Sequence, residues 1–208
     1  MKQKLDVENW SRREHFNFFK TFDIPYYGVT IKLDCTRAYQ QAKTLGVSFY
    51  TYYLHKTLIA INQLDNFKYR IESGDVYLYD RVDASATILR DDHTFGFSYI
   101  KYVADLHEFH QIVLAEIDRV KNTTGLFTTT GPMDSIIHFS ALPWIDFSSM
   151  SQAFNFKSGD SCPQISIGKL INVNGRKQMA YGIQVHHALV DGYHVGLFLD
   201  QLQNLLNE

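Results

Sequence analysis

The change near the C-terminus from a two-residue to a helical hydrophobic period constrains the fold most. Between residues 179 and 186, Met, Tyr, Ile and Val alternate with smaller or polar residues, which predicts a half-buried strand. From Val195 to Leu206, apolar side chains fall on one face of a helix. Residues 187–194 join the two, so the fold must place a helix directly after this strand.

Strand and helix patterns are mixed along the rest of the chain. Ser48–Leu64 has the spacing of a mostly buried helix. Apolar residues after Asp105 predict a surface helix, and Asp105 with Glu108 resembles a capping box. The expected strands are Phe67–Glu72 and Val76–Tyr79, joined as a hairpin, then Thr87–Leu89, Thr94–Ile100 and Ser135–Ala141.

The order of these elements disfavours two common α/β folds. Strands and helices do not alternate regularly, and the chain has neither a GxGxxG nor a GxxxxGK[ST] loop, so a dinucleotide-binding or P-loop fold is not expected. We expect an α/β two-layer sandwich, in which a mixed sheet is packed with helices. Because the 208 residues contain no repeat or Pro/Ser-rich linker, we expect a single domain over residues 1–208.

Composition narrows the class of protein. A hydrophobic fraction of 45% with 20% charged residues is typical of a globular domain with a sizeable core. The net charge of −2 comes without a cluster of Lys and Arg, so a nucleic-acid partner is not expected. Residues 1–10 lack the apolar core of a signal peptide, and no 18-residue apolar run follows, which predicts a cytoplasmic protein without a membrane partner.

The two cysteines do not predict a metal site or a disulfide framework. Cys35 and Cys162 are far apart in the sequence, without a CxxC or Cys/His ligand spacing. We expect buried thiols and no metal.

The segment between the C-terminal strand and helix carries the candidate chemistry. It reads QVHHALVDGYH and contains His186, His187 and Asp191. A neutral imidazole, with an ordinary pKa of about 6.5, can take a proton from a hydroxyl near physiological pH, so His187 is a candidate general base. Asp191 offers an acceptor four residues later, and Gly192 permits a sharp redirection of the backbone.

Two other interpretations of this segment remain open. His186, His187, Asp191 and His194 are possible metal ligands, although adjacent side chains on a strand point to opposite faces and cannot converge on one ion. His187 can also be a hydrogen-bonded core histidine without a catalytic role. The surrounding pattern favours catalysis over both.

That pattern, HHxxxDG at the end of a strand near the C-terminus, is shared by a superfamily of CoA-dependent acyltransferases. Two further segments, Trp10–Phe16 (WSRREHF) and Ser140–Trp144 (SALPW), are similar to signatures of the chloramphenicol acetyltransferases. The resemblance covers essentially the whole chain and continues through Ser48–Tyr50, Tyr79–Val82, Thr94–Phe95 and Gln201–Gln203. It implies the CoA-dependent acyltransferase fold.

The resemblance also implies catalytic roles for four residues. His187 would remove the proton from an acceptor hydroxyl, which attacks the thioester of acetyl-CoA in a ternary complex, without an acyl-enzyme. Ser140 matches the serine that donates a hydrogen bond to the oxyanion, where one such donor is typically worth about 2.7 to 4 kcal/mol. Arg12 and Asp191 match a buried salt bridge that holds the active-site loop.

Binding residues follow from the same resemblance. The implied acceptor-site residues are Phe18, Phe19, Tyr27, Phe95, Phe127 and Ser166, of which Ser166 stands where the family has a water-anchoring threonine. The implied cofactor-site residues are Tyr50, Trp144 and Lys169. The chain departs from the family pattern at Ser48 and Leu170 near the cofactor, and at Pro25, Phe97, His138, Gln152 and Phe154 in the acceptor pocket.

The expected function is therefore O-acetylation of chloramphenicol or a similar small alcohol by acetyl-CoA, with antibiotic resistance as the implied role. The family is a homotrimer in which the histidine of one subunit faces the acceptor pocket of its neighbour. One alternative is a non-catalytic or altered-specificity trimer that binds a small molecule. Another is the core domain of a dihydrolipoamide acyltransferase, for which the 208 residues hold no lipoyl-bearing segment or linker.

Overall fold

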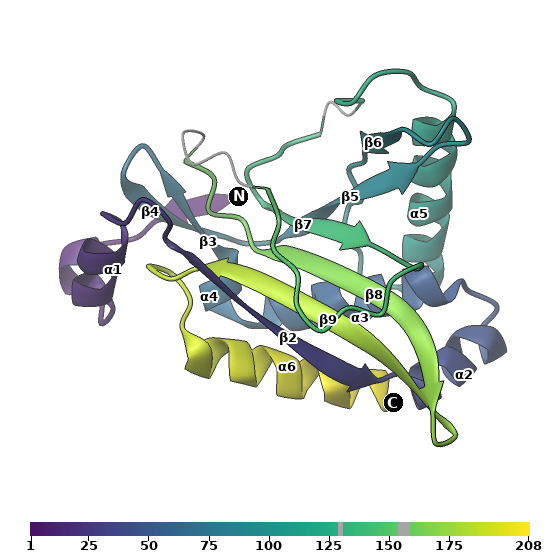
Figure 1. Ribbon diagram of the computed structural model, residues 1–208. Coiled ribbons are helices and arrows are strands. Elements are labelled where there is room, and N and C mark those ends of the chain that lie inside the picture. Colours follow the sequence, from purple (N-terminus) through teal and green to yellow (C-terminus); the bar gives the residue numbers. More distant parts are fainter. Residues whose placement is uncertain (129–130, 154–158) are drawn as a thin grey trace.

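A six-stranded mixed sheet forms the centre of the computed structural model, which describes residues 1–128, 131–153 and 159–208. The strand order is β2-β9-β8-β7-β5-β6, with β5, β7 and β8 parallel and the other pairs antiparallel (Figure 1). The strands are β2 (Tyr26–Asp34), β5 (Asp83–Leu89), β6 (Phe95–Phe97), β7 (Ile136–Ala141), β8 (Gln164–Val173) and β9 (Arg176–His186). The expected mixed α/β architecture is confirmed.

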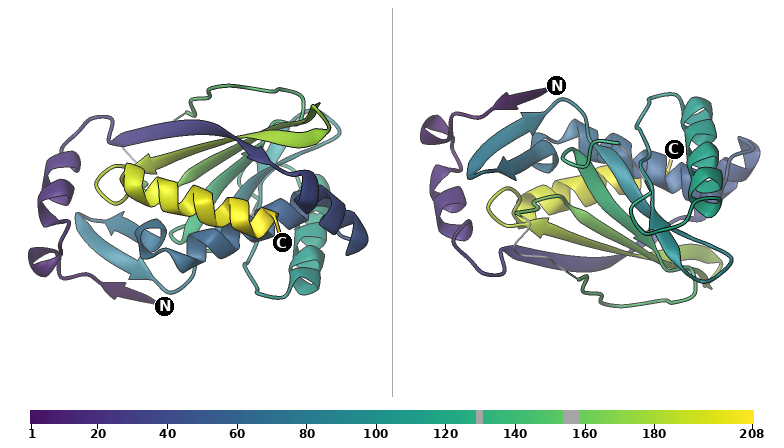
Figure 2. Two further views of the ribbon diagram at one scale, coloured as in Figure 1. Left: turned by 90° about the horizontal axis from the view of Figure 1, so that it is seen from below. Right: turned by 90° about the horizontal axis from the view of Figure 1, so that it is seen from above.

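Helices cover one face of this sheet. The long helices α3 and α6 run side by side along it, and α5 packs at the β5 and β6 end (Figures 1 and 2). The helices are η1 (Val7–Asn9), α1 (Arg13–Phe19), α2 (Thr36–Thr44), α3 (Phe49–Gln63), α4 (Asp65–Lys68), α5 (Leu106–Lys121) and α6 (Gly192–Leu206). Within the described ranges, none of them has the length and apolar character needed to cross a bilayer.

A small antiparallel sheet lies beside the main one. It consists of β1 (Lys2–Lys4), β4 (Asp75–Tyr79) and β3 (Tyr69–Glu72), in that order. The hairpin expected from the sequence is β3 and β4, and Gly74 in its turn has φ +88°, which favours glycine.

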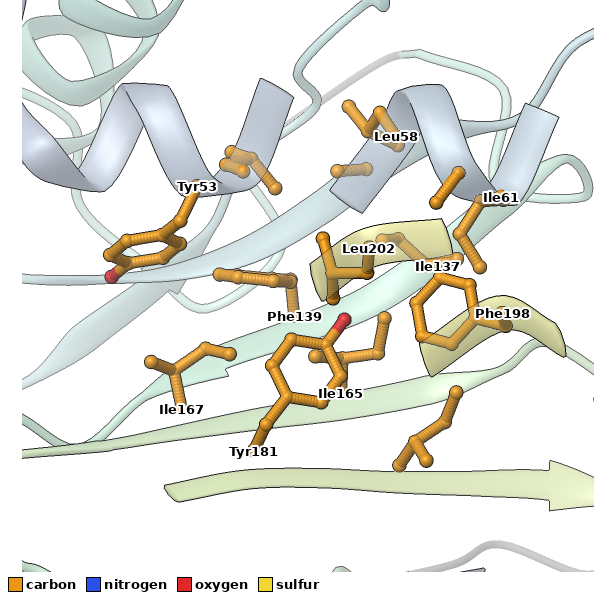
Figure 3. Packing of buried hydrophobic residues seen from close by; sticks show 14 of the residues in the cluster. Tyr53, Leu58, Ile61, Ile137, Phe139, Ile165, Ile167, Tyr181, Phe198 and Leu202 are labelled. Carbon is orange, nitrogen blue, oxygen red and sulfur yellow. The ribbon is translucent and has the colours of Figure 1, made fainter. Parts of the chain in front are cut away.

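The hydrophobic core lies between the main sheet and helices α3 and α6. Tyr181 of β9 and Phe198 of α6 are both less than 2% exposed, and their ring centroids are 6.1 Å apart. Figure 3 shows side chains of the sheet pointing toward those of the helices, with Ile137, Phe139, Ile165 and Ile167 facing Tyr53, Leu58, Ile61 and Leu202. Burying one large apolar side chain stabilises the fold by about 1.5 to 3 kcal/mol, so the alternation in β9 fixes which face meets the helices.

The opposite face of the sheet is polar. Cross-strand pairing aligns Ser85, His138, Gln164 and Gln184 in one row, and Ser140, Ser166 and Gly182 in the next. Residues 142–153, which follow β7, cross this face (Figure 1), where the Gln184 amide donates to Met150 O over 2.9 Å. Polar side chains that would otherwise face solvent are thereby covered.

The start of α5 carries only half of the expected capping box. The carboxylate of Asp105 accepts a hydrogen bond from the backbone N–H of Glu108 over 2.8 Å. The reciprocal bond, from the Glu108 side chain to the backbone of Asp105, is not among the hydrogen bonds of the described residues. Asp105 therefore acts as an ordinary N-cap.

Candidate active site

The loop between β9 and α6 is held by backbone hydrogen bonds and by burial. The backbone N–H of His187 donates to Pro25 O over 2.7 Å, and those of Leu189 and Val190 both donate to His186 O over 3.0 Å. The side chains of Ala188, Leu189 and Val190 are at most 2% exposed. The backbone of His187 is therefore held both by the buried residues that follow it and by Pro25, which is distant in the sequence.

Asp191 ends this loop by capping α6. Its carboxylate accepts from the backbone N–H groups of Tyr193 (3.1 Å) and His194 (3.4 Å), while its own N–H donates to His194 Nδ1 over 3.3 Å. This reciprocal arrangement is a complete capping box. The special role expected for Gly192 is wrong, because its φ is not positive and a Cβ there would meet no atom within 4 Å. The cap, rather than glycine, redirects the chain.

Arg12 and Asp191 form the ion pair that the sequence predicted. Arg12 Nη1 lies 2.5 Å from Asp191 Oδ2, and the two side chains are 11% and 28% exposed. Burial raises the pKa of Asp191, but the hydrogen bond and charge of Arg12 together with His194 outweigh burial, and the net pKa is lowered. The carboxylate is therefore charged while it caps α6, and the N-terminal segment is tied to the candidate catalytic loop.

Aromatic rings hold the His187 imidazole. The ring stacks on Phe19 at a centroid distance of 3.9 Å and lies 4.5 Å from the ring of Tyr27. His187 Nδ1 and the Tyr27 hydroxyl are both buried without a hydrogen-bond partner among the described residues. Burial raises the pKa of Tyr27 to about 12. A buried imidazole nitrogen and a buried hydroxyl that both lack partners are unusual in a folded protein. Together they indicate a place where another molecule binds.

The adjacent histidine belongs to a different environment. His186 is buried on the other side of the strand, where it lines a pocket that His187 does not reach. Burial lowers the pKa of His186 to about 4, which keeps its imidazole neutral. The two histidines therefore point to opposite sides and cannot bind one metal ion together, as expected from their spacing.

A well-formed pocket lies over the polar face of the sheet. Its volume is about 680 Å³, within the range of small-molecule sites. Ser140 lines it, with its hydroxyl 3.3 Å from Thr87 Oγ1. The other residues that line it are Phe16, Lys20, Thr21, Phe22, Asp23, Pro25, Tyr26, Ile71, Gly74, Ser85, Thr87, Phe97, His138, Phe139, Gln152, Ala153, Gly159, Asp160, Gln164 and His186.

The predicted acceptor-site residues fall into two separate groups. Phe18, Phe19 and Tyr27 gather at the His187 end, where Phe18 and Phe19 are in edge contact. Phe95 and Phe127 lie beside Phe97 at the opposite end of the sheet, and Phe127 is 80% exposed. None of these five lines the pocket, so within one chain the structure does not bring them together.

Ser166 is the sixth predicted acceptor-site residue. Ser166 is buried under the β7–β8 segment, and its hydroxyl accepts from the Gln152 amide over 2.6 Å. Pro25, Phe97, His138 and Gln152, four of the expected departures from the family, line the pocket. Phe154, the fifth, is outside the described residues.

The partner of His138 was not predicted from the sequence. His138 Nε2 lies 2.6 Å from Asp160 Oδ2, although the residues are 22 positions apart and on different elements. Burial lowers the pKa of His138, but Asp160 and Cys162 raise it to about 10. Burial raises the pKa of Asp160, but His138 lowers it to about 2. Both groups are therefore charged at neutral pH, inside the pocket.

Cys162 lies beside this ion pair. Ligand-type atoms of His138, Asp160 and Cys162 are within 4.8 Å of one another, which the spacing of the cysteines did not indicate. The direct nitrogen–oxygen contact of His138 and Asp160 satisfies both groups without an ion. The absence of a metal stays a prediction.

His187 and Ser140 are too far apart to act on one hydroxyl within a chain. Ser140 pairs through Ser166 with Gly182, which lies four residues before His186 on β9. A rise of about 3.3 Å per residue and two strand spacings of about 4.8 Å put the Cα atoms of Ser140 and His186 roughly 16 Å apart. His187 is on the far side of that strand from the pocket.

Comparison with known proteins decides the family. A family model described as chloramphenicol acetyltransferase matches residues 2–203. The chain belongs to the chloramphenicol acetyltransferase family. It is 30% identical to chloramphenicol acetyltransferase 3 of Escherichia coli, over 98% of this chain and 96% of that protein.

Solved structures agree with this assignment. One, a chloramphenicol acetyltransferase, is 32% identical and superposes with a TM-score of 0.90, covering 99% of this chain and 100% of that one. The truncated catalytic core of a 2-oxoacid dehydrogenase complex from Thermoplasma acidophilum has a TM-score of 0.71 at 17% identity, with 95% of each chain covered. At that identity the likeness shows a shared fold alone.

One departure from the chloramphenicol acetyltransferase pattern, at Ser48, has a structural explanation. Ser48, expected as lysine, caps α3 by accepting from the backbone N–H of Thr51 over 3.0 Å. Leu170, expected as tyrosine, pairs with Met179 just after the irregularity in β8. Lys169, at that irregularity, donates its N–H to Ile145 O over 2.8 Å and so lies close to exposed Trp144.

Proposed function

We propose that the chain, as one domain over residues 1–208, transfers an acetyl group from acetyl-CoA to a hydroxyl of chloramphenicol or a similar small alcohol. Family membership carries the reaction class. The observation in this structure that supports it best is the arrangement of an immobilised imidazole at one end of the sheet and a pocket containing Ser140 over its polar face.

In the proposed mechanism His187 acts as the general base. Its neutral imidazole takes the proton of the acceptor hydroxyl as the oxygen attacks the thioester carbonyl carbon. Ser140 donates a hydrogen bond to the oxyanion of the tetrahedral intermediate. When the carbon–sulfur bond breaks, His187 returns the proton to the departing thiolate, so the reaction balances without a metal.

The proposed co-substrate site uses Tyr50, Trp144 and Lys169. The Tyr50 hydroxyl is buried without a hydrogen-bond partner in the described part of the chain, which fits a site that another molecule completes. Trp144 offers a 65% exposed flat surface and Lys169 an exposed cation, which fit an anionic nucleotide thioester.

A homotrimer would bring His187 of one subunit close to Ser140 of another. Because the Cα atoms of Ser140 and His186 are about 16 Å apart on one chain and His187 lies on the far side of the strand from the pocket, we propose that His187 of one subunit reaches the pocket of its neighbour. Large exposed aromatic side chains near both parts, Phe18 (60%) and Phe127 (80%), support burial against a second copy.

The reaction is tested by thiol release from acetyl-CoA, with and without chloramphenicol, for the wild type and His187→Ala. Chloramphenicol-dependent release that the variant lacks is expected. Release that persists in the variant would rule out His187 as the base. Binding of chloramphenicol without release by the wild type would favour the alternative, a non-catalytic small-molecule-binding trimer.

The shared site is tested by mixing two inactive variants, His187→Ala and Ser140→Ala, by co-expression. In random trimers about one interface in four combines an intact His187 with an intact Ser140, so roughly a quarter of wild-type activity should return. Activity that stays at the level of the single variants would show that both residues act within one chain.

A cytoplasmic location and an antibiotic-resistance role belong to the same proposal. Expression in a chloramphenicol-sensitive bacterium should raise the inhibitory concentration of chloramphenicol, with the protein in the cytosolic fraction, and His187→Ala should abolish the protection. Growth unchanged by the wild-type protein would contradict the resistance role.

A further inference from the structure

Two buried polar groups without partners lie side by side with His138 on the floor of the pocket. Ser85 pairs with His138 across β5 and β7, and His138 pairs with Gln164 across β7 and β8, so the three side chains form one row. Ser85 is 2% and Gln164 6% exposed, and all three residues line the pocket. We call Ser85, His138 and Gln164 the floor row.

The floor row has unused hydrogen-bonding capacity. Ser85 Oγ and Gln164 Oε1 have no partner among the described residues. Leaving such a group unsatisfied is costly in a folded protein, and a serine hydroxyl can donate or accept, whereas an amide oxygen only accepts. The row thus offers both a donor and an acceptor to a molecule in the pocket.

The charges of the described pocket residues favour an uncharged occupant. His138 is neutralised by Asp160 at 2.6 Å, and the remaining charged residues that line the pocket, Lys20 and Asp23, are one of each sign. A ligand with a net charge would meet no surplus of the opposite charge there. Aromatic side chains, among them Phe22 and Phe97, supply flat walls for an apolar body.

The floor row lies at a defined spacing from Ser140. His138 is two residues before Ser140 on β7, which at about 3.3 Å per residue is roughly 7 Å along the strand. We propose that the floor row recognises a second, uncharged polar group of the acceptor alcohol. This group both donates and accepts hydrogen bonds, and it lies about 7 Å from Ser140, beside which the reacting hydroxyl attacks the thioester. This inference rests on the proposed function and narrows its substrate class.

Two small alcohols of matched shape test the inference. In 4-(hydroxymethyl)benzamide a carboxamide stands across the ring from the hydroxyl, whereas 4-methylbenzyl alcohol has a methyl group there. Calorimetric titration should show that the wild type binds the benzamide about tenfold more tightly. Ser85→Ala and Gln164→Met should each bring the ratio of the two dissociation constants toward one.

Gln184→Met is the matched control. Gln184 occupies the next position of the same cross-strand row, but its amide is bonded to Met150 O and it does not line the pocket. The ratio should therefore keep its wild-type value. Ser85→Ala removes only an atom without a protein partner, so it keeps the test valid even if Gln164→Met fails to fold.

Failure of the inference can be distinguished from failure of the proposed function. Three results would overturn the inference: equal binding of the two alcohols, no detectable binding of the benzamide, or a ratio unchanged in Ser85→Ala. Equal binding would indicate that water alone satisfies the polar groups of the floor row. Thiol release from acetyl-CoA is measured separately. A preference for the benzamide without release of thiol by any alcohol would uphold recognition and contradict acetyl transfer.

Discussion

The loop that carries His187 and the floor of the pocket are organised in opposite ways. The loop residues lie next to each other in the sequence, and the loop is closed by a complete capping box and an ion pair to Arg12. The floor row is assembled from three strands and leaves two buried polar groups without partners. The rigid loop favours one fixed chemical step. The floor row, by contrast, leaves room for the choice of acceptor to change when its residues are substituted.

The largest effect that this comparison predicts is at His187. His187→Ala should reduce kcat by about 10²- to 10⁴-fold, because the general base is lost. His186→Ala serves as the neighbouring control and should have a much smaller effect, since His186 lies on the pocket side of the strand. Steady-state kinetics measure both, and equal losses would show that the loop does not separate the roles of the two histidines.

Removing Arg12 should destabilise the protein. Arg12→Leu leaves the charge of Asp191 partly buried without its partner, which should lower the free energy of unfolding by about 3 to 5 kcal/mol. Arg13→Leu, which removes a solvent-exposed ion pair with Glu8, should cost far less. Urea denaturation at a fixed protein concentration gives both values. Similar losses of unfolding free energy in the two variants would mean that the ion pair of Arg12 with Asp191 does not stabilise the fold.

Ser140→Ala tests whether the pocket contains the oxyanion donor. The loss of one donor should lower kcat by about 10²-fold with little change in KM for the acceptor. Thr87→Val removes the hydroxyl 3.3 Å from Ser140 and should have a smaller effect. A change in KM alone would place Ser140 in acceptor binding instead.

The pair of His138 and Asp160 predicts a pH dependence of stability. The pKa of His138 is raised from 6.5 to about 10, so its contribution is complete below pH 6.5 and is lost as the pH rises toward 10. The pKa of Asp160 is lowered from 3.8 to about 2, so its contribution is complete above pH 3.8 and is lost as the pH falls toward 2. The pair stabilises most between these limits.

Thermal melting of the wild type and Asp160→Asn across this range checks the prediction. The difference in Tm should be largest near pH 5 to 6 and should shrink toward pH 10. A constant difference between pH 6 and pH 10 would show that His138 is not charged by Asp160.

The smallest effect is expected at Gly192. Gly192→Ala should change the free energy of unfolding by less than about 1 kcal/mol, and in the stabilising direction, because the position is helical and open. Differential scanning calorimetry measures it. A clear destabilisation would restore a conformational role for this glycine.

Contiguous patterns made much of the structure predictable. The alternation in β9 and the apolar face of α6 identified both elements and the loop between them, and the motif in that loop led to the family. By contrast, β2 and β8 were not predicted. The first half of β8, QISIG, does alternate polar and apolar residues, so the sequence carried a strand pattern there that was missed. In contrast, β2 is an edge strand with only one buried residue and so shows a weaker pattern.

The floor of the pocket was beyond prediction for a different reason. Asp160 meets His138 only because the segment before β8 folds back over the sheet, and no spacing in the sequence encodes that contact. The missing partners of Ser85 and Gln164 likewise become visible only when the neighbours of each atom are known. Sequence patterns located the candidate catalytic loop, whereas the proposed recognition by the floor row depends on contacts between distant segments.

The position of β2 has a consequence for how the chain is made. Among the strands that the structure describes, its only partner in the main sheet is β9, which is synthesised last of them. At translation rates of about 5 to 20 residues per second, the segment emerging from the ribosome waits roughly 8 to 30 seconds for that partner. During this interval an unpaired strand edge is open to other nascent chains, so the yield of folded protein should depend on translation speed and on chaperones.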